Sequence, residues 1–182
     1  MEKALIVIDY TNDFVAEDGV LTAGAVAQAA EGTIVSLVEN FVKQGDYVVL
    51  TVDTHYPEDP YHPETKLFPP HNIVGTAGIE LYGQLKDFYV GHQDDAQVYY
   101  LPKTRYSAFA GTDLDLRLRA RGIRELHLVG VATDICVLHT AVDAYNLGYR
   151  IVVHRDGVAS FNPAGHDWAL GHFELSLGAE IR

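Results

Sequence analysis

Apolar segments that each end at a polar residue recur along this chain, and they constrain its fold more than any other feature. Residues 4–8 are all apolar and are followed by Asp9, and residues 47–52 lead in the same way to Asp53. Runs of this kind are typical of strands that are covered on both faces, as in parallel sheets. Three further segments are predicted to be strands, namely 97–101, 126–129 and 151–154. Residues 180–182 are predicted to begin a sixth strand.

Segments with the apolar spacing of helices separate these strands. The clearest covers residues 25–44, and further helices are predicted over 80–85, 114–121, 134–146 and 163–177. Alternation of strands and helices predicts a doubly wound α/β fold, in which a mainly parallel sheet of about six strands lies between two helical layers. Neither a repeat nor a linker interrupts residues 1–182, so we expect a single domain.

Charge and composition exclude several classes of protein. The formal net charge is −12, from 13 Lys and Arg against 25 Asp and Glu, which disfavours nucleic acid as a partner. The sequence has neither an apolar run long enough for a membrane helix nor the pattern of a secretory signal, so we expect no membrane association. The single cysteine, Cys136, cannot form an internal disulfide, which is consistent with the reducing cytoplasm.

Cys136 stands where a thiol can be reactive. It follows the predicted strand 126–129 and a turn at Gly130, and Thr133 and Asp134 can cap a helix. The free N–H groups of a first helical turn favour thiolate, so we expect a thiol pKa lowered from about 8.5 toward neutrality. The same groups could bind an oxyanion. The alternative interpretation is a buried cysteine that packs as a small apolar residue.

Other reactive side chains follow the neighbouring strands. Asp9, Asp53 and Lys103 come at or just after the ends of the first three strands. Ligands of parallel sheets bind beyond the carboxyl ends of the strands, so these groups should converge with Cys136. A carboxylate beside a thiol can accept its proton and later return it, and a lysine between them keeps the carboxylate ionised. The sequence therefore predicts a nucleophilic triad of Asp9, Lys103 and Cys136.

The loop after Asp53 contains possible metal ligands. Asp53 and His55 are two residues apart in an extended segment and should point to the same side. His71 is a third candidate, and either His62 or Glu64 could complete the set. Carboxylate and imidazole ligands suit Zn²⁺, Mn²⁺ or Fe²⁺. The alternative is a loop of solvent-exposed polar residues.

Five motifs occur in a fixed order along nearly the whole chain, namely LIVIDYTNDF, VDTHYP, FPPHNIVGTAGIEL, LPKTRYSAF and VGVATDICVLHTAVDAYNLGY. Together they resemble the cysteine-hydrolase family of nicotinamidases and isochorismatase-like amidohydrolases, most closely the nicotinamidases. The resemblance implies the isochorismatase-like hydrolase fold and the hydrolysis of nicotinamide to nicotinate and ammonia in pyridine-nucleotide salvage. Analogues such as pyrazinamide are further expected substrates.

The resemblance also implies roles for individual residues. Cys136 corresponds to the nucleophile, Asp9 to the general acid and base, and Lys103 to the cationic partner of that carboxylate. The bond between Val131 and Ala132 resembles a non-proline cis peptide of the family. It would direct the N–H of Ala132, together with that of Cys136, toward an oxyanion.

The resemblance further implies one divalent metal ion, with zinc expected and manganese or iron as alternatives, bound by Asp53, His55 and His71. We expect Glu64 rather than His62 to be the fourth ligand, because Glu64 is nearer the segment that leads to His71. The ion would bind the pyridine nitrogen. An aromatic pocket for the ring is implied at Phe14, Phe68 and Tyr106, beside Ala132, with ordinary core packing as the alternative.

Several other functions compete with this interpretation. A carbamoyl-amide hydrolase of the same family would not need a strong metal site, and an isochorismatase-type hydrolase would not need the cysteine. A hydrolase that attacks with metal-bound hydroxide would remain active after thiol alkylation. A catalytically inactive metal-binding or interaction module is the alternative outside enzymes. We expect a homo-oligomer.

Overall fold

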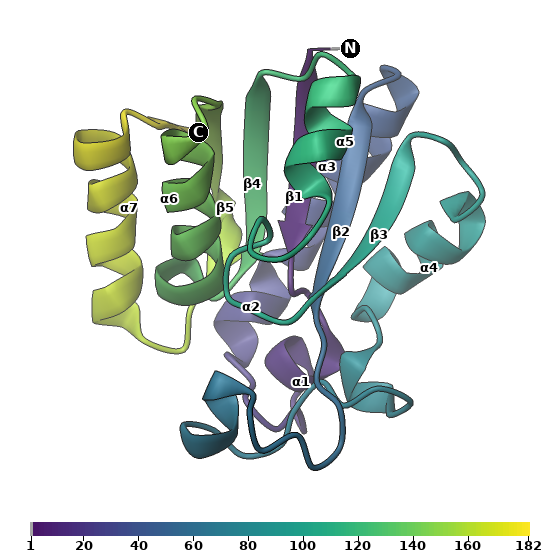
Figure 1. Ribbon diagram of the computed structural model, residues 1–182, viewed down its shortest axis with the longest axis vertical. Coiled ribbons are helices and arrows are strands. Elements are labelled where there is room, and N and C mark those ends of the chain that lie inside the picture. The colour runs from purple at the N-terminus through teal and green to yellow at the C-terminus, as the bar shows by residue number, and fades with distance from the viewer. Residues whose placement is uncertain (1) are drawn as a thin grey trace.

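A parallel sheet forms the central layer of the computed structural model, which describes residues 2–182 (Figure 1). Its strands are β1 (Lys3–Ile8), β2 (Tyr47–Asp53), β3 (Val98–Lys103), β4 (Glu125–Val131), β5 (Arg150–Ala159) and β6 (Glu180–Ile181). In space their order is β3-β2-β1-β4-β5-β6, and every neighbouring pair is parallel. The predicted doubly wound α/β fold is therefore confirmed.

Helices cover both faces of this sheet (Figure 1). One face packs against α1 (Asn12–Val15), α2 (Ala25–Ala29), α3 (Glu31–Lys43) and α4 (Gly83–His92). The other packs against α5 (Leu114–Ala120), α6 (Leu138–Asn146) and α7 (Pro163–Leu177). The strand segments read as continuous apolar runs because both faces are buried in this way.

Some element boundaries differ from those predicted. The helix expected over 25–44 is divided at Ala30, whose N–H bonds to the carbonyl of Ala27 at 3.1 Å and so tightens the chain into a three-residue turn. The helix expected over 80–85 begins instead at Gly83 and forms α4. The stretch 10–24, for which no helix was predicted, contains the short helix α1.

Gly130 lies inside β4 rather than in a turn after it. Its φ is +116°, and it pairs in register with Ile8 of β1. A Cβ at position 130 would overlap the backbone carbonyl oxygen of Ile8, so only glycine lets the two strands approach so closely here. This contact fixes the end of β1, and with it Asp9, against β4.

The carboxyl ends of the strands meet at the lower end of the molecule in Figure 1, opposite the start of β1 and the C-terminus. The connection from β2 to α4 passes beneath them and contains two short 3₁₀ turns, Pro63–Lys66 and Ala77–Ile79. The predicted reactive residues lie at this end. Among residues 2–182, no helix has both the length and the apolar character that a membrane crossing requires.

Candidate active site

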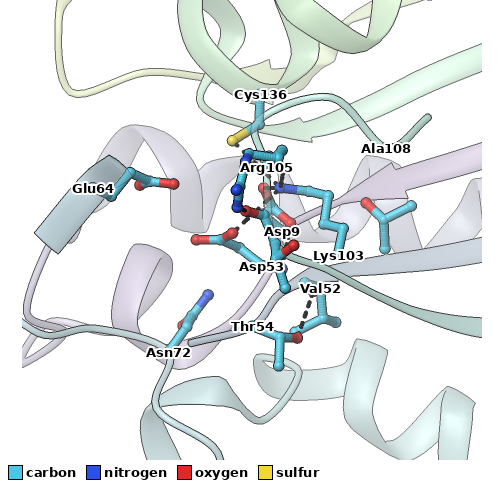
Figure 2. A network of polar contacts seen from close by, with 12 residues as sticks. Asp9, Val52, Asp53, Thr54, Glu64, Asn72, Lys103, Arg105, Ala108 and Cys136 are labelled. Atoms are coloured by element: carbon cyan, nitrogen blue, oxygen red, sulfur yellow. Dashed lines mark hydrogen bonds and ion pairs between the residues drawn. The ribbon is translucent and has the colours of Figure 1, made fainter. Parts of the chain in front are cut away.

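Four strands bring reactive side chains to one point at their carboxyl ends (Figure 2). Lys103 Nζ lies 2.8 Å from Asp9 Oδ2 and 3.7 Å from Asp53 Oδ1. It also lies 3.7 Å from Cys136 Sγ, in the turn that follows β4. The structure thus assembles Asp9, Lys103 and Cys136, which are called the thiol cluster below.

Backbone contacts between neighbouring strands fix these side chains. Asp9 follows β1 with a φ of +54°, and its N–H donates to the carbonyl of Thr51 at 2.9 Å. Its Oδ1 accepts the N–H of Asp53 at 2.8 Å. Asp53 is the register partner of Lys103, and Lys103 also donates to the carbonyl of Arg105 at 3.0 Å. The cluster is therefore held by the sheet itself.

Burial and neighbouring charges decide the protonation of Asp9 and Lys103, whose side chains are both fully buried. Burial raises the pKa of Asp9 to about 6, with Lys103 lowering it and Asp53 raising it further. Burial works against the charge of Lys103, but Asp9, Cys136 and Asp53 outweigh it and raise the pKa of the ammonium. At neutral pH the pair is therefore a carboxylate beside an ammonium.

The expectation of a lowered pKa for Cys136 is wrong. Cys136 lies in a π-helical turn, Thr133–Val137, in which the N–H of Val137 donates to the carbonyl of Ala132 at 3.2 Å. Burial raises the pKa of the thiol well above its ordinary value, and the carboxylate of Asp9 adds to this, against the opposing effect of Lys103. Removal from water thus outweighs the helix terminus, and the thiol needs a base.

The peptide bond between Val131 and Ala132 is cis, in agreement with the family resemblance. It joins the end of β4 to the turn that carries Cys136. Val131, Ala132 and Cys136 line the same cavity. Ala132 and Cys136, whose backbone N–H groups are the predicted oxyanion donors, therefore both border this cavity.

A second group of predicted residues also comes together, beside the thiol cluster. Asp53, His55, Glu64 and His71 are all buried, and each offers a ligand atom within 4.8 Å of the others. This set is called the four-residue cluster. His71 Nε2 lies 3.4 Å from Asp53 Oδ2 and 3.5 Å from Glu64 Oε2. Among residues 2–182 this nitrogen has no hydrogen-bond partner of good geometry.

His62 lies close to this cluster but is occupied elsewhere. Its Nε2 lies 2.8 Å from the carbonyl oxygen of Thr104, and its Nδ1 accepts the N–H of Glu64 at 3.2 Å. Both ring nitrogens are thus engaged, and His62 caps the 3₁₀ turn that presents Glu64. The geometry therefore favours Glu64 over His62 as the fourth member of the cluster.

The electrostatics of the four-residue cluster favour a cation at its centre. Burial works to raise the pKa of Asp53, but Lys103, His55 and His71 hold it well below its ordinary range. Burial works to lower the pKa of His71, but Asp53 and Glu64 raise it to about 10. Two carboxylates and two imidazoles, one of which has a ring nitrogen without a partner among the described residues, are a donor set that fits a divalent metal ion.

A cavity opens between the two clusters. Phe14, Phe68 and Tyr106 line it, together with Ala132, as the resemblance implied. The centroids of the Phe14 and Phe68 rings lie 5.4 Å and 6.1 Å from that of His71. The cavity therefore combines an aromatic wall, the thiol and the four-residue cluster.

Four further cavity residues were not predicted, namely Leu21, Ala23, Ile135 and Phe161. The first two lie in a loop without periodic spacing, and Ile135 offered no signal other than its place beside Cys136. Phe161, which is 53% exposed, comes from the connection between β5 and α7. Long-range contacts place such residues, and local sequence patterns do not reveal them.

Fold and site together define a hydrolase-like α/β protein with a buried thiol. A family model for the isochorismatase domain matches residues 3–182, and the chain belongs to the isochorismatase family. An uncharacterised isochorismatase family protein, PncA of Bacillus subtilis, is 64% identical over 181 residues, which cover 100% of this chain and 99% of the relative. The predicted family resemblance is confirmed.

Solved structures extend this comparison. The nicotinamidase/pyrazinamidase PncA from Bacillus subtilis is 63% identical with a TM-score of 0.98, covering 100% of this chain and 99% of the other. The pyrazinamidase/nicotinamidase from Streptococcus mutans is 55% identical with a TM-score of 0.97 and covers both chains completely. The pyrazinamidase of Pyrococcus horikoshii in complex with zinc is 28% identical with a TM-score of 0.86, covering 100% and 99%.

Proposed function

We propose that this protein is a cysteine amidohydrolase that converts nicotinamide to nicotinate and ammonia. The observation that carries the proposal is the fully buried Lys103, which contacts both Asp9 and Cys136. Cys136 in turn lines a cavity that Asp53, Glu64 and His71 of the four-residue cluster also line. The activities named for the Bacillus subtilis and Streptococcus mutans structures support nicotinamide and pyrazinamide as substrates.

The first half of the reaction uses the thiol cluster. Asp9 takes the proton of Cys136, and the thiolate attacks the carboxamide carbon of the substrate. Lys103 balances the negative charge that moves between the carboxylate and the sulfur. The backbone N–H groups of Ala132 and Cys136 stabilise the oxyanion of the tetrahedral intermediate. Asp9 then gives its proton to the departing ammonia, which leaves a thioester on Cys136.

The second half releases the acid. Asp9 takes a proton from a water molecule, whose oxygen attacks the thioester carbon. The C–S bond breaks, Asp9 returns its proton to the sulfur of Cys136, and the acid leaves and gives its own proton to solvent to become nicotinate. A pKa of about 6 suits Asp9 to both directions of transfer, because the group is ionised near neutral pH and yet basic enough to hold a proton briefly.

The four-residue cluster would hold one divalent ion, and we propose zinc, with manganese or iron as alternatives. The zinc in the Pyrococcus horikoshii structure supports this choice. When bound, the ion supplies a Lewis acid for the ring nitrogen of the substrate. Phe14, Phe68 and Tyr106 orient the ring and exclude water from it. The reaction belongs to pyridine-nucleotide salvage in the cytoplasm, and we propose a homo-oligomer.

Ammonia release from nicotinamide by the wild type and by Cys136→Ala tests this function, with metal content measured on the same samples. We expect turnover in the wild type, a loss of at least about 1,000-fold in the variant, and equal metal in both. Thiol alkylation should inactivate the wild type, because Cys136 is the only cysteine. Retained activity in the variant or after alkylation would contradict the covalent route. Inactivity toward nicotinamide would contradict the substrate.

A further inference from the structure

Asn72 is a fully buried residue with an unusual set of contacts next to the four-residue cluster. It follows His71 and has a φ of +44°. Its N–H donates to Asp13 Oδ2 at 2.7 Å, and its carbonyl accepts the N–H of His55 at 3.0 Å. Its Oδ1 accepts the hydroxyl of Thr11 at 3.0 Å.

These contacts connect two members of the cluster that lie in separate segments of the chain. His71 is bonded covalently to Asn72, and His55 is hydrogen-bonded to it through the backbone. Asp13 and Thr11 anchor the same residue to the start of α1 and to the residue before it. The left-handed conformation that this requires is one that asparagine tolerates better than most residues do. Asn72 therefore fixes the spacing of both histidines.

The amide nitrogen of Asn72 has a different property. Nδ2 is buried and has no hydrogen-bond partner among the described residues, which is rare for a side-chain donor. Figure 2 shows the amide directed toward the side of the site at which Asp53 and Glu64 lie. The hydroxyl of Thr11 could serve either amide atom, because it can donate or accept. The carboxylates decide the orientation, since they attract the N–H and repel the oxygen.

We propose that Asn72 is a positioning residue of the metal centre, which fixes His55 and His71 through its backbone and donates a hydrogen bond from Nδ2 to an oxygen ligand of the bound ion. The inference rests on the proposed metal site. Groups that hold the ligands of a metal in this way typically change its affinity by about 10- to 100-fold when removed.

The variant Asn72→Gly separates the amide from the backbone role, because glycine adopts a positive φ without strain and keeps both backbone hydrogen bonds. The metal-free wild type and variant would be titrated with Zn²⁺ against a chromophoric chelator, and the absorption spectra of their Co²⁺ forms compared. Asn146→Gly, at the exposed end of α6, makes the same change away from the site and serves as the control.

We expect Asn72→Gly to bind Zn²⁺ about 10- to 100-fold more weakly and to show an altered Co²⁺ spectrum, with the control unchanged in both. Thr11→Val removes only the hydroxyl that holds the amide, and should weaken binding in the same direction by a smaller factor. A thermal melt of the metal-free protein shows whether Asn72→Gly folds. If it does not fold, the Thr11→Val variant still tests the inference.

Two outcomes would overturn the inference, and they are distinguishable. Wild-type affinity and an unchanged Co²⁺ spectrum in Asn72→Gly, or in Thr11→Val where the glycine variant does not fold, would refute the role of Asn72 and leave the metal site standing. A wild-type protein that binds neither Zn²⁺ nor Co²⁺ would refute the metal site and the role of Asn72 with it.

Discussion

Asp53 and Lys103 are register partners in β2 and β3, and their side chains meet with 3.7 Å between Oδ1 and Nζ. Asp53 belongs to the four-residue cluster through its other oxygen, Oδ2, which lies 2.7 Å from His55 Nε2. Lys103 belongs to the thiol cluster through its contact with Asp9. The two clusters therefore share one ion pair, and a change of charge in either is felt by the other.

Loss of the ammonium should destabilise the fold as well as stop turnover. Lys103→Met leaves Asp9 and Asp53 buried without their cation, and we expect a loss of about 3–5 kcal/mol in the free energy of unfolding. Urea denaturation measures it. In the double variant Asp9→Asn with Lys103→Met the unpaired charge of Asp9 is removed as well, so the loss should be smaller than the sum of the two single losses. Additive losses would show that the pair is not coupled.

Glu64 and His62 should differ in their effect on metal retention. Glu64→Ala removes a buried ligand oxygen beside His71, so we expect at least about a tenfold loss in Zn²⁺ affinity. His62→Ala removes a cap of the 3₁₀ turn and should cost mainly stability, about 1 kcal/mol. Equilibrium dialysis and a thermal melt of each variant separate the two effects. The reverse ranking in affinity would assign the fourth ligand to His62.

Asp134 connects the turn of Cys136 to the mouth of the cavity. Its carboxylate accepts the hydroxyl of Ser160 at 2.6 Å and the amide of Asn162 at 3.2 Å, the two residues on either side of Phe161. Asp134→Ala leaves the buried hydroxyl of Ser160 unpaired and releases the amide of Asn162 to water, so we expect about 1–3 kcal/mol less stability and a lower kcat/KM. Asp167→Ala, on the exposed side of α7, should stay within about 0.5 kcal/mol of the wild type. Equal effects of the two variants would contradict this connection.

Two histidines remote from the cavity should make stability fall in acid. His127 Nδ1 lies 2.8 Å from His154 Nε2, and burial lowers the pKa of both, that of His154 to about 4 with His127 and Arg182 contributing. The unfolded chain, with histidine pKa values of about 6.5, binds more protons than the folded chain below that pH.

The two histidines should therefore not change the free energy of unfolding above about pH 6.5. Below that pH they should lower it progressively toward about pH 4. Thermal melts between pH 4 and 8 measure this decrease. His154→Gln removes one of the titrating groups and should flatten the profile over that interval. An unchanged slope in this variant would assign the acid sensitivity to other residues.

Gly130 and Gly171 should respond oppositely to the same substitution. Gly130→Ala combines a positive φ with overlap onto the backbone of Ile8, and we expect a loss of about 2–5 kcal/mol. Gly171→Ala adds a methyl group in open space within α7, where alanine favours the helix, and should gain about 0.5–1 kcal/mol. Chemical denaturation of both variants provides the comparison. A neutral Gly130→Ala would mean that β1 and β4 can separate without cost.

Much of the fold and most of the site could be predicted because both depend on short stretches of sequence. Strands buried on both faces give continuous apolar runs, and Asp9, Asp53 and Lys103 are found by their place at the ends of these runs. The helix Pro163–Leu177 has the predicted bounds, because proline and glycine mark its two ends.

What could not be predicted depends on contacts between distant segments. The direction of the pKa shift of Cys136 follows from its burial beside Asp9, and a helix terminus alone suggested the opposite. Phe161 is positioned at the cavity by its neighbours Ser160 and Asn162, which both donate hydrogen bonds to Asp134 in the turn that carries Cys136. Neither periodicity nor motif spacing indicated that the amide of Asn72 is buried beside the four-residue cluster.

Pro102, the residue before Lys103, has a consequence for the behaviour of the protein at high concentration. It lies on β3, one of the two outer strands of the sheet, and it is exposed. The carbonyl of Lys103 faces β2, where it accepts the N–H of Thr54, so the backbone of Pro102 faces outward. Proline offers no N–H there, and this edge cannot readily template a strand from another chain. Pro102, the neighbour of Lys103, thus also disfavours aggregation through the β3 edge of the sheet.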